Sequence, residues 1–370
     1  MTKISRTTDM TQGSEMRHII MFSLPLLAGN LLQQTYNIVD TMVVGRYLGD
    51  DALAAVGATG SITYLFYTLC IGLSVGAGII VAQYFGAGKK KALRSAIFNS
   101  ALVTAIFGIV ISLLSVPAAK PILELLNVPD KLIGDSAVYM QIACGGTIAV
   151  AAYNWINAIM RALGDSKTPL IFLGAASLLN ALLDLLFVVV FKFGIAGAAW
   201  ATVLTQALSA ISCIVYCFAV SGEIKLTADD LHADKDMMCR CVKTGVPIAI
   251  QNGLISVSMV ALQRVTNGFG ETVMAAYTVS MRIEQFVQQP FSSLNAAVST
   301  FTGQNIGAGK EKRAQKGLAC AIKISVIFSA VVLVLFTLFG GAITSWFVKG
   351  KTVISISAKA LIITSLFYWS

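Results

Sequence analysis

A nine-residue segment in the first half of the chain returns in the second half. Gln83–Lys91 (QYFGAGKKK) aligns without a gap on Gln304–Lys312 (QNIGAGKEK), at an offset of 221 residues. The same offset places Gly49–Ala55 on Gly270–Ala276. Segments that recur in the same order at one offset indicate a duplicated unit, so we expect two halves with similar folds.

The composition indicates that the two halves lie in a membrane. The chain is 56% hydrophobic and 12% charged, with a mean hydropathy of +0.77, which excludes a soluble domain of this size. Apolar runs of about twenty residues, long enough to cross a bilayer, recur throughout. We predict an all-α polytopic membrane protein with spans at residues 17–43, 52–82, 94–117, 136–160, 169–191, 195–220, 243–266, 272–300, 317–340 and 352–370.

The longest polar stretch, residues 221–242, separates the two copies of the repeat. We predict a six-helix lobe over residues 1–220, a cytoplasmic inter-lobe loop over 221–242 and a second lobe over 243–370 with four of six helices. The offset would end a complete second lobe at about residue 441. The sequence therefore predicts that two helices are missing, either from a fragment or from a truncated gene.

Lysine and arginine residues gather in alternate loops. With the N-terminus inside, the inner segments hold more than twice as many of them as the outer segments. This bias predicts a cytoplasmic N-terminus and a location in the plasma membrane. The net charge of +9 lies in short loops at one membrane face, so we expect contact with lipid and no nucleic-acid partner.

One pair of polar residues stands alone in an apolar helix. In the run Leu178–Phe187 only Asn180 and Asp184 are polar, and their spacing puts both on one helix face. A carboxylate within a membrane helix costs about 2.5–3.5 kcal/mol, so it indicates a functional site. A structural hydrogen bond between helices is the alternative. Asp40 in the first span is a second candidate, or else a solvated residue at the outer end of its helix.

Polar side chains on other helices could complete a site around these carboxylates. Amide and hydroxyl groups suit a sodium ion and a protonated carboxylate equally well. Glu284 could join such a site, or form a structural pair with Arg282 or with another helix. The candidates are Tyr36 and Asn37 in the first span, Asn154 and Asn157 in the fourth, Thr202 and Gln206 in the sixth, and Tyr277, Met281, Glu284 and Gln288 in the eighth.

The chain also carries a set of separated motifs, which are Pro25, Asp40–Gly49 (DTMVVGRYLG), Gln83–Gly88 (QYFGAG), Arg161–Pro169 (RALGDSKTP), Asn180 with Asp184, and Gly194–Thr202 (GIAGAAWAT). Together they resemble the multidrug and toxic compound extrusion (MATE) family. The resemblance implies two six-helix lobes and the cation-coupled export of organic cations. It further implies that Asp40 takes part in coupling to the ion.

The resemblance also bears on which residues bind the ion. In the branch of the family with an acidic pair in the first lobe, it implies that Asn180, Asp184 and Thr202 join Asp40. The other branch has acidic residues in the seventh and tenth helices, and this chain has none in the seventh or in residues 351–370. A first-lobe site is therefore favoured, with a proton or a sodium ion as the coupling ion and no other cofactor.

These residues predict an antiporter that acts as a monomer. Two neighbouring carboxylates repel each other in a low-dielectric bundle, so the pair should hold a proton or a sodium ion, whose arrival displaces a bound cationic drug. Rocking of the two lobes would supply alternating access.

Two other functions remain as alternatives to this one. A flippase for lipid-linked precursors would need several basic residues in its cavity, and a non-transporting scaffold or fragment is the remaining alternative. An enzyme is not expected, since Ala162 breaks the Gly-x-Gly-Asp pattern of intramembrane proteases. A metal site is not expected either, because Cys239 and Cys241 lack further ligands at zinc spacing.

Overall fold

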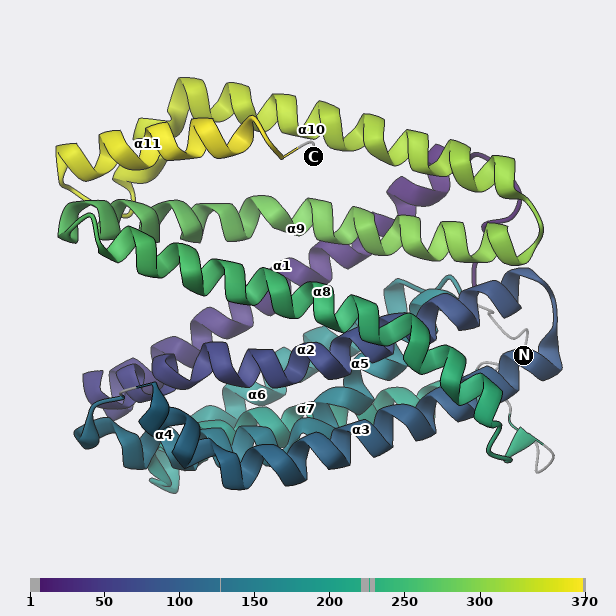
Figure 1. Ribbon diagram of the computed structural model, residues 1–370, viewed down its shortest axis with the longest axis horizontal. Helices are drawn as coiled ribbons and strands as arrows, with labels where there is room; N and C mark the ends of the chain where they lie inside the picture. Colours follow the sequence, from purple (N-terminus) through teal and green to yellow (C-terminus); the bar gives the residue numbers. More distant parts are fainter. Residues whose placement is uncertain (1–6, 127, 221–225, 227–229, 369–370) are drawn as a thin grey trace.

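Helices make up nearly all of the chain that the structure describes (Figure 1). The computed structural model describes residues 7–126, 128–220, 226 and 230–368. In chain order its elements are α1 (Glu15–Leu48), α2 (Asp50–Gly86), α3 (Lys90–Leu125), α4 (Asp130–Gly145), α5 (Thr147–Ala162), α6 (Lys167–Asp184), the π-helix η1 (Leu185–Val190), α7 (Gly194–Val220), α8 (Lys235–Asn267), α9 (Glu271–Gly307), α10 (Glu311–Ser345) and α11 (Lys351–Ser365). The predicted all-α membrane fold is confirmed.

Within these described residues, six helices are long and apolar enough to cross a membrane, and the bent pair α4–α5 adds a seventh. Three of the predicted spans do not meet this standard on their own. Helices α1 and α9 carry polar side chains along their length, and α11 has only 15 residues. Helix α1, one of these three, carries Asp40 of the candidate site.

The fourth predicted span, residues 136–160, is two helices and not one. Helix α4 ends at Gly145 and α5 begins at Thr147, with an angle of 44° between them. The intervening Gly146 lies so close to α7 that a Cβ there would collide with the side chain of Val203. The glycine pair gives the chain the freedom to bend at this point, and close packing against α7 requires it.

The two copies of the repeat fold in the same way, which confirms the internal duplication. Helices α2 and α9 each follow a glycine with positive φ, Gly49 at 88° and Gly270 at 90°. The loop after each helix holds another, Gly88 at 66° and Gly309 at 70°. Only glycine adopts this left-handed region without a steric cost, so the repeated glycines fix the same turns in both halves.

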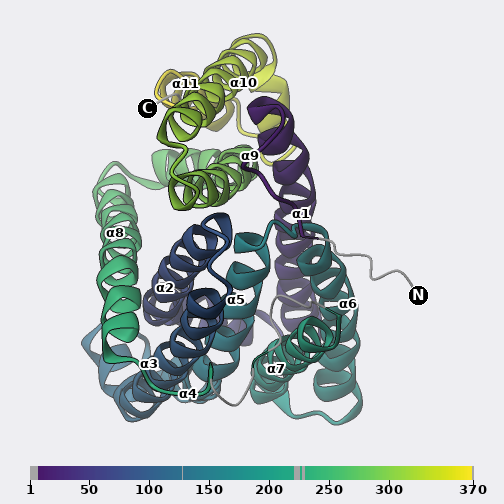
Figure 2. The same cartoon turned by 90° about the vertical axis from the view of Figure 1, so that its right-hand side faces the viewer.

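The helices form two groups that are joined by α1 (Figures 1 and 2). Helices α2 to α7 lie in one group, and α9, α10 and α11 lie in the other, while α8 runs along the side of both. Helix α1 packs against α6 and against α9. Helix α8 is the equivalent of α1 in the second repeat, and it packs against α2. The first helix of each repeat therefore packs against the second helix of the other repeat.

The repeated loops, residues 87–91 and 308–313, meet at one end of the bundle, which we call the basic end. There the ends of α2 and α9 cross with their backbones in close contact. A Cβ on Gly86 would collide with the carbonyl oxygen of Gln304, and a Cβ on Gly307 would collide with that of Gln83. The lobes are therefore in direct backbone contact at the basic end.

Residues 7–14, which we call the N-terminal segment, run across this same end. The amide of Met10 donates to Gln304 Oε1 (2.9 Å), and Gln304 Nε2 donates to the carbonyl oxygen of Ala162 in the first lobe (2.9 Å). The guanidinium of Arg313 donates to three backbone carbonyls of the segment and forms an ion pair with Glu15 (3.1 Å). The segment and Gln304 thus connect the two lobes.

The start of the second lobe differs from its prediction. Helix α8 begins at Lys235, so residues 235–242 of the predicted inter-lobe loop are helical. Asp234 caps this helix by accepting hydrogen bonds from the amides of Asp236 and Met237, a strong start signal. Residues 221–225 and 227–229 of the predicted loop, and residues 369–370 of the last predicted span, lie outside the described residues.

Candidate functional site

The two polar residues of the run Leu178–Phe187 lie on α6, and both are buried. Asn180 is 1% exposed and Asp184 is 0% exposed, whereas Leu178 and Leu182 on the opposite face are 72% and 65% exposed. The spacing of four residues places the amide and the carboxylate on the face that points into the lobe. The α-helix ends at Asp184, and the π-helix η1 begins directly after it, a distortion that occurs often at functional sites.

The side chain of Asp40 in α1 lies within hydrogen-bonding reach of Asp184 in α6. Two carboxylates that are both ionised cannot share a hydrogen bond, because neither has a proton to donate. Both oxygens of Asp184 and Oδ1 of Asp40 are fully covered and receive no hydrogen bond from an N–H or O–H donor of the described residues. Neither the donor Nδ2 nor the acceptor Oδ1 of Asn180 has a hydrogen-bond partner among the described residues. Among the described residues, the group therefore has no positively charged hydrogen-bond partner.

Hydroxyl groups from two further helices surround the pair. Tyr36 Oη on α1 donates to Thr202 Oγ1 on α7 (3.4 Å), and Tyr36 is in electrostatic range of both carboxylates. Tyr139 on α4 is in range of both as well. Four elements of the first lobe, α1, α4, α6 and α7, thus converge on Asp40 and Asp184.

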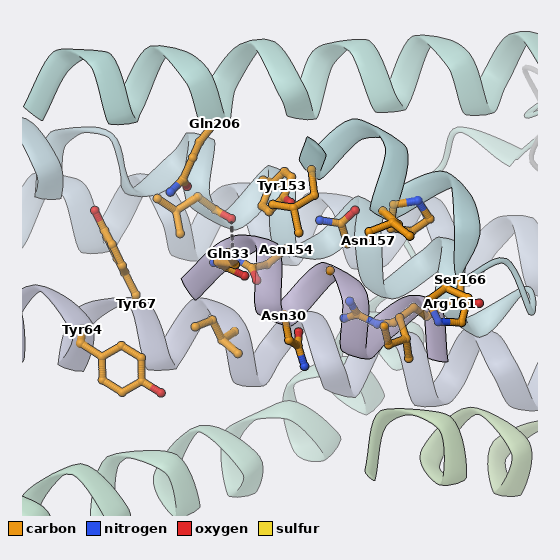
Figure 3. Close-up of a pocket in the computed structure, with 18 residues that line it drawn as sticks. Asn30, Gln33, Tyr64, Tyr67, Tyr153, Asn154, Asn157, Arg161, Ser166 and Gln206 are labelled. Atoms are coloured by element: carbon orange, nitrogen blue, oxygen red, sulfur yellow. Dashed lines mark hydrogen bonds between the residues drawn. The ribbon is translucent and has the colours of Figure 1, made fainter. Parts of the chain in front are cut away.

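A cavity of about 230 Å³ lies in the first lobe (Figure 3). Amide, phenol and apolar groups line it, which suits an aromatic ligand with a few polar atoms. A smaller adjoining cavity shares Gln33, Tyr153 and Gln206 with it and reaches Tyr36. The lining residues of the larger cavity, which we call the first-lobe pocket, are Pro25, Leu26, Gly29, Asn30, Gln33, Tyr64, Tyr67, Ile71, Val150, Tyr153, Asn154, Asn157, Arg161, Ser166, Pro169, Leu170, Leu173 and Gln206.

Several amide groups of this pocket have free hydrogen-bonding capacity. Asn154 Nδ2 donates to the Val150 carbonyl oxygen (2.8 Å). In contrast, Asn157 Oδ1 and Gln206 Oε1 are fully covered and accept no hydrogen bond from the described residues. Buried polar atoms of this kind favour a ligand that offers donors.

The structure brings most of the first-lobe candidates together. Asp40, Asn180, Asp184, Thr202 and Tyr36 form the acidic group, and Asn154, Asn157 and Gln206 line the pocket beside it. Asn37, in contrast, is exposed and lines neither of the two cavities.

The four candidates of the second lobe, Tyr277, Met281, Glu284 and Gln288, lie on α9 and do not line the first-lobe pocket. Glu284 is within hydrogen-bonding reach of Thr364 and Tyr368, which places it in a separate group between α9 and the end of the chain. Gln288 is exposed. Of the two structural partners considered for Glu284, another helix is the one that the contacts favour.

Sequence reasoning did not identify five residues that the structure places at the site. Tyr64, Tyr67 and Tyr153 line the pocket, and Tyr139 lies near the carboxylates. Tyrosines are common in apolar spans, so their identity alone gave no signal. Arg161 entered the sequence analysis only as the first residue of the Arg161–Pro169 motif, although its place one turn after Asn157 could have put it on the same helix face.

The described residues contain no group of three or more histidine, cysteine, aspartate or glutamate side chains that could hold a metal ion. The oxygen atoms of Asp40, Asp184, Asn180 and Thr202 are nevertheless of the type that binds a hard monovalent cation. The site can thus accommodate either a proton on a carboxylate or a small cation among oxygens.

Comparison with known proteins agrees with this architecture. The MatE family model matches residues 25–186 and 247–370. The probable multidrug resistance protein YoeA of Bacillus subtilis is 31% identical over 365 residues, covering 97% of this chain and 79% of YoeA. The probable multidrug resistance protein YpnP of the same organism is 31% identical over 307 residues, covering 82% of this chain and 68% of YpnP.

Solved structures share the fold. An outward-facing multidrug resistance MATE family transporter of the MOP superfamily superimposes with a TM-score of 0.90 at 24% identity, covering 98% of this chain and 82% of that one. A MOP superfamily transporter from Pyrococcus furiosus gives the same TM-score of 0.90 and the same coverage. With a family model that matches both halves and two relatives above 30% identity, the chain belongs to the MatE family of membrane transporters.

Proposed function

We propose that this protein is a cation-coupled antiporter that exports organic cations across the plasma membrane in exchange for a proton or a sodium ion. The contact between the partly buried carboxylate of Asp40 and the buried carboxylate of Asp184 is the observation that carries the proposal. Their covered oxygens receive no hydrogen bond from the described residues. A pair that is purely structural would be expected to have such partners, because leaving a buried carboxylate unpaired is costly.

Each of the two coupling ions would relieve the repulsion within this pair. A proton on one carboxylate converts the repulsion into a hydrogen bond to the other. A sodium ion would take oxygens from Asp40, Asp184, Asn180 and Thr202 as ligands. In both cases the ion neutralises the charge that attracts a cationic substrate.

The first-lobe pocket lies beside Asp40 and Asp184, and this position would allow a drug in the pocket to be exchanged for an ion at the carboxylates. Aromatic rings of Tyr64, Tyr67 and Tyr153 would hold the apolar part of a drug and attract its positive charge by cation–π contacts. When the ion arrives, the negative potential at Asp40 and Asp184 falls and the drug leaves. The names of the relatives YoeA and YpnP, both probable multidrug resistance proteins, support drugs as the substrates.

Alternating access would follow from movement of the lobes against each other. The excess of lysine and arginine supports a cytoplasmic position for the basic end and the N-terminus. The lobes touch at the basic end through the crossing of α2 and α9, so with this orientation the cytoplasmic side would be the closed one. Opening that side requires this crossing and the contacts of the N-terminal segment to separate.

A flippase for lipid-linked precursors fits the pocket less well. Such a substrate carries a pyrophosphate, which several lysine or arginine side chains would be needed to hold. Arg161 is the one basic residue among those that line the first-lobe pocket. A pocket rich in tyrosine and amide groups suits an aromatic drug better.

The proposal is tested in proteoliposomes loaded with the fluorescent cation rhodamine 123. A pure proton gradient and a pure sodium gradient are imposed in separate experiments, and dye movement is followed by fluorescence. We expect one of the two gradients to drive transport, and Asp184→Asn to reduce it to background. Asp135→Asn is the matched control, because Asp135 is an exposed acid on α4. Protein that binds the dye but responds to neither gradient would contradict the proposal.

A further inference from the structure

Three sulfur-containing side chains meet in the core of the first lobe. Cys213 and Cys217 lie on α7, and their spacing of four residues puts both on one helix face. The Cys213 thiol donates to Met160 Sδ on α5 (3.3 Å), and the Cys217 thiol lies within hydrogen-bonding reach of Cys213. We call these three residues the sulfur cluster. None of them lines either of the two first-lobe cavities described above, so the proposed exchange does not use them.

The sulfur cluster is buried among apolar side chains. Cys213 and Cys217 are both 0% exposed, and Met160 is 3% exposed. All three belong to one hydrophobic core cluster, which also contains Trp155 and Ile159 of α5. Both cysteines are free thiols, so each sulfur atom retains the capacity to bind a metal ion.

The donor atoms define the kind of metal ion. Thiolate and thioether sulfur are soft ligands that select Cu(I), whereas sodium, magnesium and calcium ions take oxygen ligands. Zinc is held by four ligands, or by three and a water molecule, and an apolar core is a poor place for that water. Two thiols and one thioether in a buried core therefore suit a soft monovalent ion.

The balance of charge favours the same ion. When Cu(I) binds, one thiol gives its proton to the solvent and a sulfur–copper bond replaces the S–H bond, with no change in oxidation state. One thiolate and one Cu(I) ion together are neutral, which an apolar core tolerates, because an uncompensated buried charge is costly. A divalent ion would require both thiols to lose their protons before the site became neutral.

The sulfur cluster has a negatively charged group on its loop side. Asp165, in the loop between α5 and α6, is in electrostatic range of Cys217. Tyr153, which lines the first-lobe pocket, is in range of Cys213. The sulfur cluster therefore lies between this loop and the wall of the pocket, and a cation that approaches from the loop meets the Asp165 carboxylate first.

We propose that Met160, Cys213 and Cys217 form a binding site for Cu(I), with Ag(I) as a second ion that the same sulfur atoms would take. The bound ion ties α5 to α7, which pack against each other and contribute Asn157 and Gln206 to the first-lobe pocket. The site is separate from Asp40 and Asp184, so the inference does not depend on the proposed antiport.

Packing alone predicts a different behaviour for these residues. Free cysteine acts as a small hydrophobic side chain, and methionine fills irregular gaps in a core. Under that interpretation Met160→Leu, which conserves volume, changes nothing that copper can report. Cys70 on α2 provides the comparison, since it is equally buried at 0% exposure but belongs to a separate core cluster.

The test follows transfer of Cu(I) from its bicinchoninate complex to the purified full chain, in detergent and without oxygen. We expect the wild type to take up Cu(I). Cys213→Ala and Cys217→Ala should each weaken the binding by about tenfold or more, because loss of even an outer-shell partner lowers metal affinity by about 10–100-fold. Met160→Leu should weaken it as well, with an unchanged melting temperature in the absence of copper. Cys70→Ala is the matched control and should bind Cu(I) as the wild type does.

The wild-type protein gives a second test that does not depend on the folding of a variant. X-ray absorption at the copper edge should show sulfur atoms alone around the bound ion. A shell that contains nitrogen or oxygen would overturn the inference. So would a wild type that takes no Cu(I) from bicinchoninate, or an affinity that Cys213→Ala, Cys217→Ala or Met160→Leu leaves unchanged.

Discussion

The carboxylates of Asp40 and Asp184 meet inside the first lobe, although one lies in the first helix of the chain and the other at the last residue of α6. Under the proposed function, this contact makes the two residues act as a single unit. Whatever occupies one oxygen changes the charge that the other experiences.

We predict that the single substitutions Asp40→Asn and Asp184→Asn are each as harmful as both together. Either change removes one of the two negative charges. The repulsion between the carboxylates then disappears, and a bound cation is no longer needed to relieve it. Gradient-driven dye transport should fall to background in all three variants, because residues that act as a unit have non-additive effects. Transport by each variant is compared at equal amounts of folded protein, judged by size-exclusion chromatography. Partial losses that add up in the double variant would show that the two carboxylates act separately.

Ion and drug should compete for the protein. Protons bind the carboxylate pair more fully as the pH falls, so binding of rhodamine 123 should weaken at low pH, or else as the sodium concentration rises. The dependence should vanish when Asp40 and Asp184 are both changed to Asn. Equilibrium binding across a pH series and a sodium series measures this. If the double variant keeps the full ion dependence, coupling lies elsewhere and Glu284 becomes the next residue to test.

Gly86→Ala and Gly307→Ala should disturb the closed basic end to a similar extent. In each case the new methyl group collides with a backbone carbonyl of the opposite lobe. Overpacking of this kind costs about 1–3 kcal/mol, and we expect a lower melting temperature in detergent for both variants. Gly174→Ala on α6 is the control, since a Cβ there meets no atom within 4 Å. A melting temperature that is unchanged in both variants would mean that the lobes are not in contact here.

Removing the guanidinium of Arg313 should release the N-terminal segment. Arg313 donates to three backbone carbonyls of the segment and pairs with Glu15, and charged hydrogen bonds contribute about 1.5–3 kcal/mol each before the effect of solvent is discounted. Arg313→Gln should therefore speed amide hydrogen exchange at residues 10–13. Lys312→Gln, at an exposed neighbour, should not. Arg313→Lys should recover little, because an ammonium group cannot span several carbonyls.

The helical fold and the repeat could be read from the sequence because both depend on local signals. Apolar runs of membrane length and the glycines of the repeated loops are visible without any contact information. The bend at Gly146 was not predicted, because the glycine pair is compatible with a straight helix until Val203 of α7 is placed against it. The early start of α8 at Lys235 was hidden by the charge of its first turn.

The site was predictable to the extent that its residues stand out from an apolar background. Asn180 and Asp184 are the only polar residues in their run, and a polar pair must find partners inside the bundle. Arg161 and the tyrosines of the pocket gave no such contrast. Their convergence depends on the packing of α1, α2, α5 and α7, which no spacing within one helix encodes. The separation of Glu284 from the pocket has the same origin, because its contacts come from α11 and the residues after it.

At the crossing of α2 and α9, the same segment of each repeat contacts the other. The contact therefore resembles the isologous interface of a two-fold dimer, although both sides belong to one polypeptide. In a two-fold dimer both copies of a residue must do the same task, but here the two copies can differ. At equivalent positions, Tyr84 accepts a hydrogen bond from Arg240 at the start of α8 (2.6 Å), and Asn305 donates to Met10 ahead of α1 (3.2 Å). The last turns of α2 and α9 thus each contact the chain where it enters the other lobe, with side chains suited to different partners. The symmetry of this crossing follows from the repeat in the sequence. Because the two copies differ in sequence, a substitution in one copy changes the contacts on its own side and leaves those of the other copy unchanged.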